Sequence, residues 1–299
     1  MVNVRIPIGG FLLLAGMFNS AMCAGSFKFQ RPKTIMHVFD QRVRDVFRSV
    51  EHWKSMGYDA LQLSPLQKSI GGNQWWTKYQ PIDHCQIEGL GSKEELKELC
   101  RKCSEQDMLV IGDVVFNHMA VVASRHEWQR AQKDKGYHEE LLRRLDDRFK
   151  PLDRHDFNPW KDMMDDDWDN ENRFEGWGAG EWADLKPTEK VLGRHKQHLD
   201  ILVECGVRGF RFDAAKHIRP ETLRIYVDYI RDICPDAYIY LEVLSSDPRQ
   251  HAFFDGWADT TDFGYCFALR EAMMRCASLS SLLPMLPAMT CAHFILMSQ

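Results

Sequence analysis

The sequence predicts an α/β fold, a barrel of parallel β-strands with helices outside, and three observations lead to it. Short apolar, strand-like runs alternate with amphipathic, helix-like segments from about residue 34 onward. Apolar runs end in carboxylates at Asp113, Asp213 and Glu242, and such barrels place reactive groups at the C-terminal ends of their strands. The chain has 299 residues, 44% of them hydrophobic, which is enough for one large core.

The first half of the predicted barrel lies before His118. Apolar alternation marks strands, and apolar residues three and four apart mark helices. The expected segments are strand 34–39, a helix over 40–57 that ends at Gly57, strand 58–65, a long loop that includes 75–83, helix 92–106 and strand 108–116. These segments make three consecutive βα units, and a parallel barrel is the simplest fold for them.

Between His118 and about Leu185 the alternation stops. This stretch is polar and rich in acids, Gly and Trp, above all over residues 161–185, and it predicts an inserted subdomain after the third strand. The βα order then resumes with helix 189–206, strand 207–212, helix 220–233 and strand 237–243.

The N-terminus has the pattern of a signal peptide. Arg5 precedes an apolar stretch over residues 6–18, and small residues follow near Ala21. An N-terminal barrel helix is the alternative. The expected organisation is a signal peptide at 1–24, a first barrel part at 25–118, the insertion at 119–185 and a second barrel part at 186–299. A signal peptide implies secretion, either extracellular or periplasmic.

The charge of the chain excludes two classes of binding partner. The net charge is −5 and no block of Lys or Arg occurs, so neither nucleic acid nor an anionic membrane surface is expected as a partner. No later segment is apolar for long enough to span a membrane.

The cysteines form an even set once Cys23 is lost with the signal peptide, and the sequence does not assign their pairing. Cys100 and Cys103 form a C-x-x-C in a helical segment without a second pair, so ordinary helix cysteines are expected there rather than a zinc site.

Three segments carry a resemblance. DVVFNH ending at His118, GFRFDAAKH ending at His217 and YLEV ending at Val243 resemble, in this order, the signature regions of the α-amylase family of glycoside hydrolases. The resemblance implies a (β/α)8 barrel of the TIM type and a retaining hydrolase for the α-1,4-glucosidic bonds of starch, glycogen or malto-oligosaccharides. Retention needs two carboxylates about 5–5.5 Å apart, one to attack the anomeric carbon and one to protonate the leaving oxygen.

By this resemblance Asp213 is the nucleophile and Glu242 the acid/base. Strand alternation puts Arg211 on the same side as Asp213, where its guanidinium would keep the carboxylate ionised and oriented. Glu242 ends an apolar run, and a partly desolvated carboxyl suits a general acid. Taken singly, either acid is better explained as a strand-end cap or a surface ion pair; the two acids together with their flanking motifs favour catalysis.

The same resemblance implies a sugar-binding surface. Pyranose rings present apolar faces that stack on aromatic planes, while their hydroxyls need polar partners. The implied substrate-binding residues are Trp75, Trp76, Tyr79, Gln80, His118, Arg211, Lys216 and His217. An aromatic cluster is also typical of a core, but this one has polar neighbours and follows a strand end.

A calcium ion is the implied cofactor. Calcium prefers six to eight oxygen ligands from carboxylates, amides and backbone carbonyls. Asn117, the Asp184 side chain and the His217 carbonyl match the family's calcium-ligand positions, and the ion would join the insertion to the barrel. Chloride is a further candidate ion, and a monomer is expected.

The resemblance covers about residues 34–275. The family uses a third carboxylate, an Asp in an Asn-His-Asp type motif on the seventh strand, and no aspartate follows Asp262 here. A C-terminally incomplete barrel is therefore expected, which leaves two interpretations. One is a truncated or frame-shifted α-amylase with impaired activity, and the other is a non-catalytic glucan-binding or interaction protein. A third interpretation keeps the fold but changes the reaction, because related enzymes act on sucrose, trehalose or branch points, or transfer glucosyl units. The loop at 75–81 is most similar to α-amylase proper.

Overall fold

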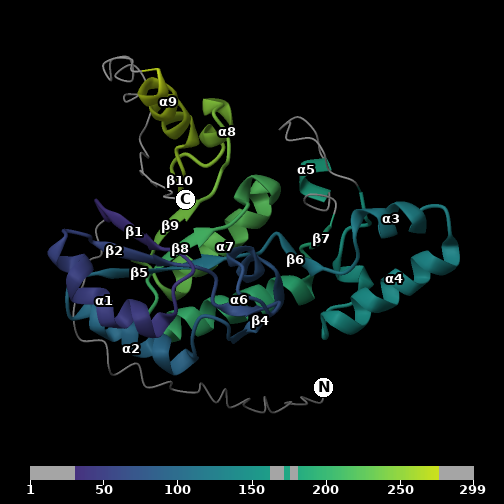
Figure 1. Ribbon diagram of the computed structural model, residues 1–299, viewed down its shortest axis with the longest axis horizontal. Coiled ribbons are helices and arrows are strands. Elements are labelled where there is room, and N and C mark those ends of the chain that lie inside the picture. Colours follow the sequence, from purple (N-terminus) through teal and green to yellow (C-terminus); the bar gives the residue numbers. More distant parts are fainter. Residues whose placement is uncertain (1–30, 162–171, 176–180, 276–299) are drawn as a thin grey trace, which may run out of the picture.

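A computed structural model describes residues 31–161, 172–175 and 181–275 of the chain (Figure 1). The predicted signal peptide at residues 1–24, together with Cys23, Cys276 and Cys291, lies outside these described residues. The cysteines within them are all free thiols, and Cys100 and Cys103 are buried side chains of one helix. None of the described helices is both long enough and apolar enough to cross a bilayer.

A six-stranded sheet forms the centre of the molecule. Its order follows the chain, β1-β2-β5-β8-β9-β10, and every neighbouring pair is parallel. The strands are β1 Ile35–Val38, β2 Ala60–Leu63, β5 Leu109–Val114, β8 Gly209–Phe212, β9 Tyr238–Leu241 and β10 Asp259–Thr260. The predicted α/β barrel with an insertion after the third strand is confirmed in these residues, because β5 is the third strand of this sheet and β8, the fourth, begins about 95 residues after β5 ends.

Four helices connect these strands and pack against one another in the order α1, α2, α6, α7 (Figure 1). They are α1 Val43–Ser55, α2 Lys93–Ser104, α6 Glu189–Cys205 and α7 Pro220–Ile233. Capping residues in the sequence determine where these helices begin and end. Ser92 and Glu95 form a capping box at the start of α2, and Pro220 takes the first position of α7. Gly206 ends α6 with a φ of 100°, a left-handed conformation that glycine adopts without a Cβ clash.

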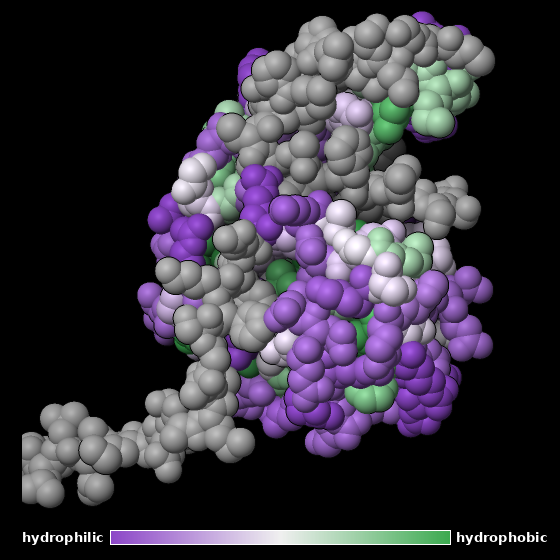
Figure 2. Space-filling view, turned by 90° about the vertical axis from the view of Figure 1, so that its left-hand side faces the viewer, coloured by the Kyte–Doolittle hydropathy of each residue, from purple (hydrophilic) through white to green (hydrophobic). Residues whose placement is uncertain are grey.

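The core lies between these helices and the sheet. Buried side chains such as Val46 of α1, Leu99 of α2 and Leu202 of α6 pack on strand residues such as Phe210. Polar residues occupy the outer helix faces, and the side of the molecule on which α1 and α2 lie is mainly hydrophilic (Figure 2). The helices are therefore held by their apolar faces, as amphipathic periodicity predicts.

The segment between β2 and α2 differs from its prediction. The sequence predicts a long loop there, but the structure has β3 Gln67–Ser69 paired antiparallel with β4 Pro81–Ile87, and a 3-10 helix, η1 Trp75–Tyr79, between them. The register of this hairpin shifts twice within three residue pairs. Because β3 is short, polar and irregularly paired, it lacks the regular alternation by which a strand is recognised in a sequence.

The insertion has a small core of its own. Strands β6 His118–Val121 and β7 Trp182–Asp184 pair antiparallel, and helices α3 Arg125–Ala131 and α4 Lys135–Arg148 form an arm beside the sheet (Figure 1). Short helices η2 Arg154–Asp156 and α5 Asn172–Glu175 complete its described elements. Trp128, Leu141 and Phe149 are buried in a hydrophobic cluster separate from the main core. This stretch therefore folds as a subdomain, although much of its acid-rich part lies outside the described residues.

The last described elements follow β9. Helix α8 Pro248–Ala252 precedes β10, and α9 Phe263–Met274 follows it; both lie beyond the C-terminal end of β9 (Figure 1). A short 3-10 helix, η4 Ala215–His217, comes after β8 at the same end of the sheet.

Candidate active site

Three carboxylates meet at the C-terminal ends of β5, β8 and β9. Asp113 is the second-last residue of β5, Asp213 follows β8 directly and Glu242 follows β9 directly. Backbone hydrogen bonds hold these ends together. The Asp213 N–H donates to the Val114 carbonyl, and the Glu242 N–H donates to the Phe212 carbonyl, each at 2.9 Å. We call this end of the sheet the rim.

Arg211 contacts all three carboxylates. One terminal nitrogen lies 2.6 Å and 2.7 Å from the two Asp113 oxygens and 3.1 Å from Asp213 Oδ1, and the other lies 2.6 Å from Glu242 Oε1. Strand register explains the arrangement. Asp113 pairs with Arg211 across β5 and β8, and Arg211 pairs with Tyr240, two residues before Glu242, across β8 and β9. Side chains two positions apart on a strand share a face, so the four charged groups converge.

Burial sets the protonation of this cluster. It raises the pKa of Asp213 well above its ordinary value, the charge of Glu242 raises that pKa further, and Arg211 opposes the rise without cancelling it. Burial likewise raises the pKa of Asp113. Arg211 was expected to keep Asp213 ionised. It does lower the pKa of Asp213, but burial and the charge of Glu242 raise this pKa by more.

Glu242 has a second contact that ties it to Asp213. Its Oε2 accepts a hydrogen bond of 2.9 Å from the backbone N–H of Ala214, the residue after Asp213. Ala214 has a φ of 48°, a left-handed conformation that costs a residue with a Cβ about 1–2 kcal/mol. Backbone strain of this kind collects at functional sites. Here it turns an N–H toward the carboxylate predicted to be the acid/base.

Tyr79 lies in the same cluster. Its hydroxyl donates to Asp113 Oδ2 at 3.0 Å, and its backbone carbonyl lies 2.9 Å from Nε2 of His118. Trp182 of β7 stacks on the His118 ring with centroids 4.6 Å apart. The His118 side chain thus contacts both Tyr79 in the loop after β2 and Trp182 in the insertion, and it joins these two segments at the rim.

The other predicted sugar-binding residues divide into exposed and buried ones. The side chains of Trp75 and Trp76 are 51% and 43% exposed, so their rings are open to a ligand. Gln80 is buried, and its Oε1 accepts from the Val121 N–H at 3.3 Å, which makes it a link to the insertion. Lys216 is also buried, with Nζ donating to the Leu244 carbonyl at 3.2 Å.

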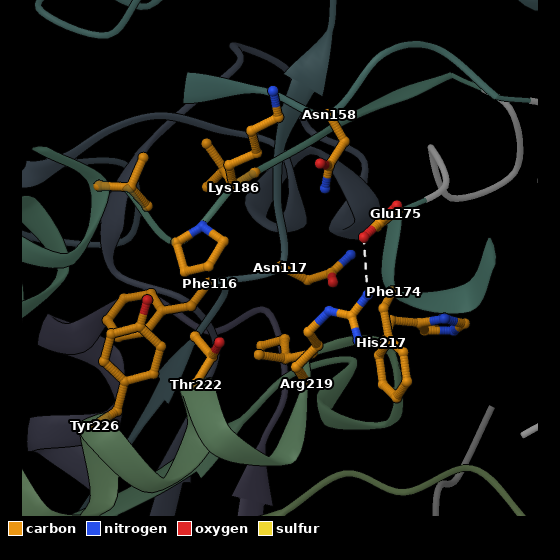
Figure 3. Close-up of a pocket in the computed structure, with 14 residues that line it drawn as sticks. Phe116, Asn117, Asn158, Phe174, Glu175, Lys186, His217, Arg219, Thr222 and Tyr226 are labelled. Carbon is orange, nitrogen blue, oxygen red and sulfur yellow. Dashed lines mark hydrogen bonds and ion pairs between the residues drawn. The ribbon is translucent and has the colours of Figure 1, made fainter. Parts of the chain in front are cut away.

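Two of the three predicted calcium ligands line a pocket beside this site, and the third, Asp184, is hydrogen-bonded to Asn158, which also lines it. Asn117 and His217 line one pocket, and the Asn117 carbonyl accepts from the N–H of Leu185, the residue after Asp184. Figure 3 shows the Asn117 and Asn158 side chains directed into this space, together with Glu175, which is ion-paired to Arg219. Amide and carboxylate oxygens from three separate segments thus surround one pocket.

Asp184 is the most unusual member of this group. Its carboxylate is buried, and Asn158 Nδ2 donates to it at 2.5 Å. Burial raises its pKa well above the ordinary value, with only partial relief from Asn158. Burying a carboxylate is costly, and a bound cation would offset that cost. The donors present are the hard oxygens that calcium prefers, so these residues fit the ion.

Two groups at the site are missing from the sequence-based prediction. His37 of β1 lies close enough to Arg211 and Glu242 for their charges to act on it, burial lowers its pKa to about 4, and its Nε2 has no hydrogen-bond partner within the described part of the chain. Asn158, the partner of Asp184, is the other. His37 was open to detection as a polar residue inside the apolar run of 34–39, whereas no local signal marks Asn158.

Comparisons with known proteins agree with this geometry. The sequence model of the α-amylase catalytic domain matches residues 43–280. An α-amylase of Aeromonas hydrophila is 27% identical over 276 residues, which are 85% of this chain and 54% of the relative. An α-amylase of Hypothenemus hampei is 26% identical over 249 residues, which are 78% of this chain and 48% of the relative. The chain thus spans about half the length of these relatives.

A solved structure shows the same fold. The structure of a variant of α-amylase I from Eisenia fetida, in complex with maltohexaose, superposes with a TM-score of 0.68 at 19% sequence identity. The match covers 85% of this chain and 54% of that one. At this identity the likeness concerns the fold alone.

Proposed function

The chain belongs to the α-amylase family of glycoside hydrolases, and from that membership we propose that it acts on α-1,4-glucosidic bonds of starch-type glucans. In this proposal Asp213 is the nucleophile and Glu242 the acid/base. The substrates are starch, glycogen or malto-oligosaccharides, in keeping with the maltohexaose bound by the Eisenia fetida relative.

One observation carries the proposal: a single guanidinium contacts both carboxylates. Arg211 reaches Asp213 at 3.1 Å and Glu242 at 2.6 Å, and Glu242 also accepts from the residue after Asp213. Two carboxyl groups held on neighbouring strand ends are the minimal equipment of a retaining glycosidase. Burial raises the pKa of Asp213 and Arg211 opposes that rise, so the guanidinium favours the ionised form that a nucleophile needs.

The chemistry assigned to the pair is balanced. An Asp213 oxygen attacks the anomeric carbon while Glu242 gives its proton to the leaving glycosidic oxygen, so one C–O bond forms as another breaks. Glu242, now ionised, then removes a proton from water, whose oxygen displaces Asp213 and restores the starting state. Asp113, through Arg211 and Tyr79, positions the pair and takes no part in bond making.

We propose that the sugar is held by the side chains named for it from the sequence. Trp75 and Trp76 offer exposed rings for stacking, and Tyr79 and His118 line the rim next to the carboxylates. Lys216 and His217 lie on η4 after β8, on the side proposed for the leaving group.

Calcium is the proposed cofactor. Asn117, Asp184 and the His217 carbonyl would hold it, with Asn158 orienting Asp184. Bound there, the ion would neutralise the buried Asp184 carboxylate and join the insertion to the rim, which makes its role structural. No step of the hydrolysis is assigned to it.

A glucan-binding protein without hydrolysis is the second candidate. One observation favours it: the rings of Trp75 and Trp76 are exposed, and stacking on a pyranose needs no catalytic residue. Binding without cleavage would still use the exposed aromatic side chains Trp75 and Trp76.

An assay with matched variants separates the two candidates. Soluble starch is incubated with the wild-type chain, with Asp213→Asn, and with Asp228→Asn, which changes an exposed carboxylate on α7. We expect release of reducing ends by wild type and Asp228→Asn, and a loss of roughly a thousandfold or more in Asp213→Asn. Retention of wild type on insoluble starch without any release would favour the binding protein. Equal release by wild type and Asp213→Asn would contradict the assigned nucleophile.

A further inference from the structure

We infer that Phe39, at the end of β1, forms an additional sugar-stacking platform together with Trp75, and that this platform selects longer glucan chains. The inference rests on the proposed function and names a contact of the same site. Phe39 immediately follows β1, so it lies at the rim, at the same end of the sheet as Asp213 and Glu242. Its side chain is 38% exposed, although Val38, the residue before it, is fully buried.

The backbone fixes Phe39 in this exposed position. Phe39 and Asp40 form the turn between β1 and α1, and Asp40 has a φ of 52°, a left-handed conformation that Asp tolerates better than most residues. The Asp40 N–H donates to the hydroxyl of Ser64 at 2.8 Å, and Ser64 is buried at the end of β2. The backbone that carries the ring is therefore ordered by hydrogen bonding, so little backbone freedom is left to be lost when a ligand binds.

Phe39 continues a row of aromatic rings that begins at the carboxylates. Tyr79, whose hydroxyl binds Asp113, lies 6.1 Å from Trp75 between ring centroids, and Trp75 lies 5.5 Å from Phe39. The Phe39 ring also meets the edge of His37 at 5.1 Å. Trp75 thus links the half-buried ring of Tyr79 at the reaction centre to the exposed ring at the end of β1.

The chemistry of this row suits a glucan chain. The Phe39 and Trp75 rings are tilted by 50° to each other, so they present two faces rather than one shared stack. Each face is able to cover the apolar side of a pyranose, while the sugar hydroxyls remain in water. Since Phe39 follows Trp75 in the row, its face serves glucosyl units farther from the cleaved bond. The consequence is a preference for long substrates over short ones.

Calorimetric binding of maltotriose and maltoheptaose tests this inference. The full chain carrying Asp213→Asn, which prevents turnover, is compared with the same chain carrying in addition Phe39→Ala, Phe39→Leu or Ile225→Ala. Ile225, on the outer face of α7, is 40% exposed and serves as the matched control. Phe39→Leu keeps an apolar side chain but removes the flat ring, and thermal melts verify that each variant is folded.

We expect Phe39→Ala and Phe39→Leu to weaken maltoheptaose binding about fivefold and to leave maltotriose binding within about twofold. Ile225→Ala should change neither. Equal weakening of both oligosaccharides, unchanged maltoheptaose binding, or wild-type-like binding by Phe39→Leu would overturn the platform while leaving the proposed function in place. No binding of either oligosaccharide by the Asp213→Asn parent would overturn both.

Discussion

Arg211 and Glu242 form an ion pair of 2.6 Å across neighbouring strands of the sheet. The same guanidinium holds Asp113 through both carboxylate oxygens and contacts Asp213 at 3.1 Å. One cation thus offsets the repulsion among three carboxylates in a buried place, and both residues proposed for catalysis depend on it for their position.

Replacing Arg211 should therefore damage the fold as well as the site. In Arg211→Met the buried carboxylates lose their cation, and breaking a buried ion pair from one side costs about 3–5 kcal/mol. We expect urea unfolding at pH 7 to show a loss of this size. Arg224→Met, which removes an exposed pair with Asp228, should cost less than about 1 kcal/mol.

Acidification should reduce the Arg211→Met defect. Asp113 and Asp213 have native pKa values raised by burial, so the folded state takes up protons on them before the unfolded chain does. Without Arg211 these pKa values rise further, and protonation removes the repulsion as the pH falls from 7 to 5. A defect that is the same at both pH values would show that the carboxylates are not the cause.

Calcium removal should lower the melting temperature. If the buried carboxylate of Asp184 holds the ion, saturating calcium stabilises the folded chain, and EDTA should reduce its melting temperature by about 5 °C or more. The matched variant is Asp184→Asn, which keeps the shape of the side chain but lacks its charge. Its melting temperature should respond much less to calcium. An EDTA melt of the wild type that coincides with the calcium melt would refute this site.

Three buried histidines predict acid sensitivity. His84, His195 and His198 lie together between β4 and α6, where His198 Nδ1 donates to the His84 carbonyl at 2.5 Å and His195 Nδ1 lies 2.7 Å from the hydroxyl of Tyr226. Burial, followed by the charges of neighbouring residues, lowers the pKa of His84 to about 3 and that of His195 well below its ordinary value. Burial also lowers the pKa of His198 to about 4. All three are thus neutral in the folded state.

The sign of the effect follows from proton binding. Between pH 6.5 and about 4 the unfolded chain binds protons on these imidazoles and the folded chain does not, so stability falls as the pH falls through this window. Urea unfolding at pH 7 and pH 5 measures the drop. The His198→Gln substitution should reduce this drop in unfolding free energy by about 2 kcal/mol. The His52→Gln substitution, at an exposed position of α1, should leave the drop unchanged. An equal drop in wild type and His198→Gln would exclude His198 as a source.

The parallel strands and outer helices were predictable because their signals are local. The helix over 220–233 begins at Pro220 and carries apolar residues at helical spacing, and the structure has α7 with these bounds. The hairpin of β3 and β4 was not predictable, since its register is irregular and its strands are held by contacts with distant segments. Helices α3 and α4 were not predictable for the same reason, because their apolar residues pack in a cluster that includes Val191 of α6 and contacts Ile82 of β4.

At the site, the strand-end positions of Asp213 and Glu242 could be predicted from the sequence, but their electrostatic environment could not. The contact of Arg211 with Asp113 and Glu242 depends on the register of β5, β8 and β9, which no single segment encodes. The burial that raises the pKa of Asp213 depends in the same way on the assembled sheet. Tyr79 illustrates a third limit: its place in an aromatic loop suggests stacking, whereas its hydroxyl binds Asp113.

The most direct test of the account is to trap the bond between Asp213 and a sugar. The Glu242→Gln variant is incubated with α-maltosyl fluoride, whose fluoride leaves without an acid, and the resulting intermediate should persist because no base remains to activate water. Mass spectrometry of a tryptic digest should then show a maltosyl unit on the peptide 212–216, which contains Asp213. The peptide should be unmodified when Asp213→Asn is also present. A maltosyl unit on another peptide, or none on 212–216, would contradict the assignment of Asp213 as the nucleophile.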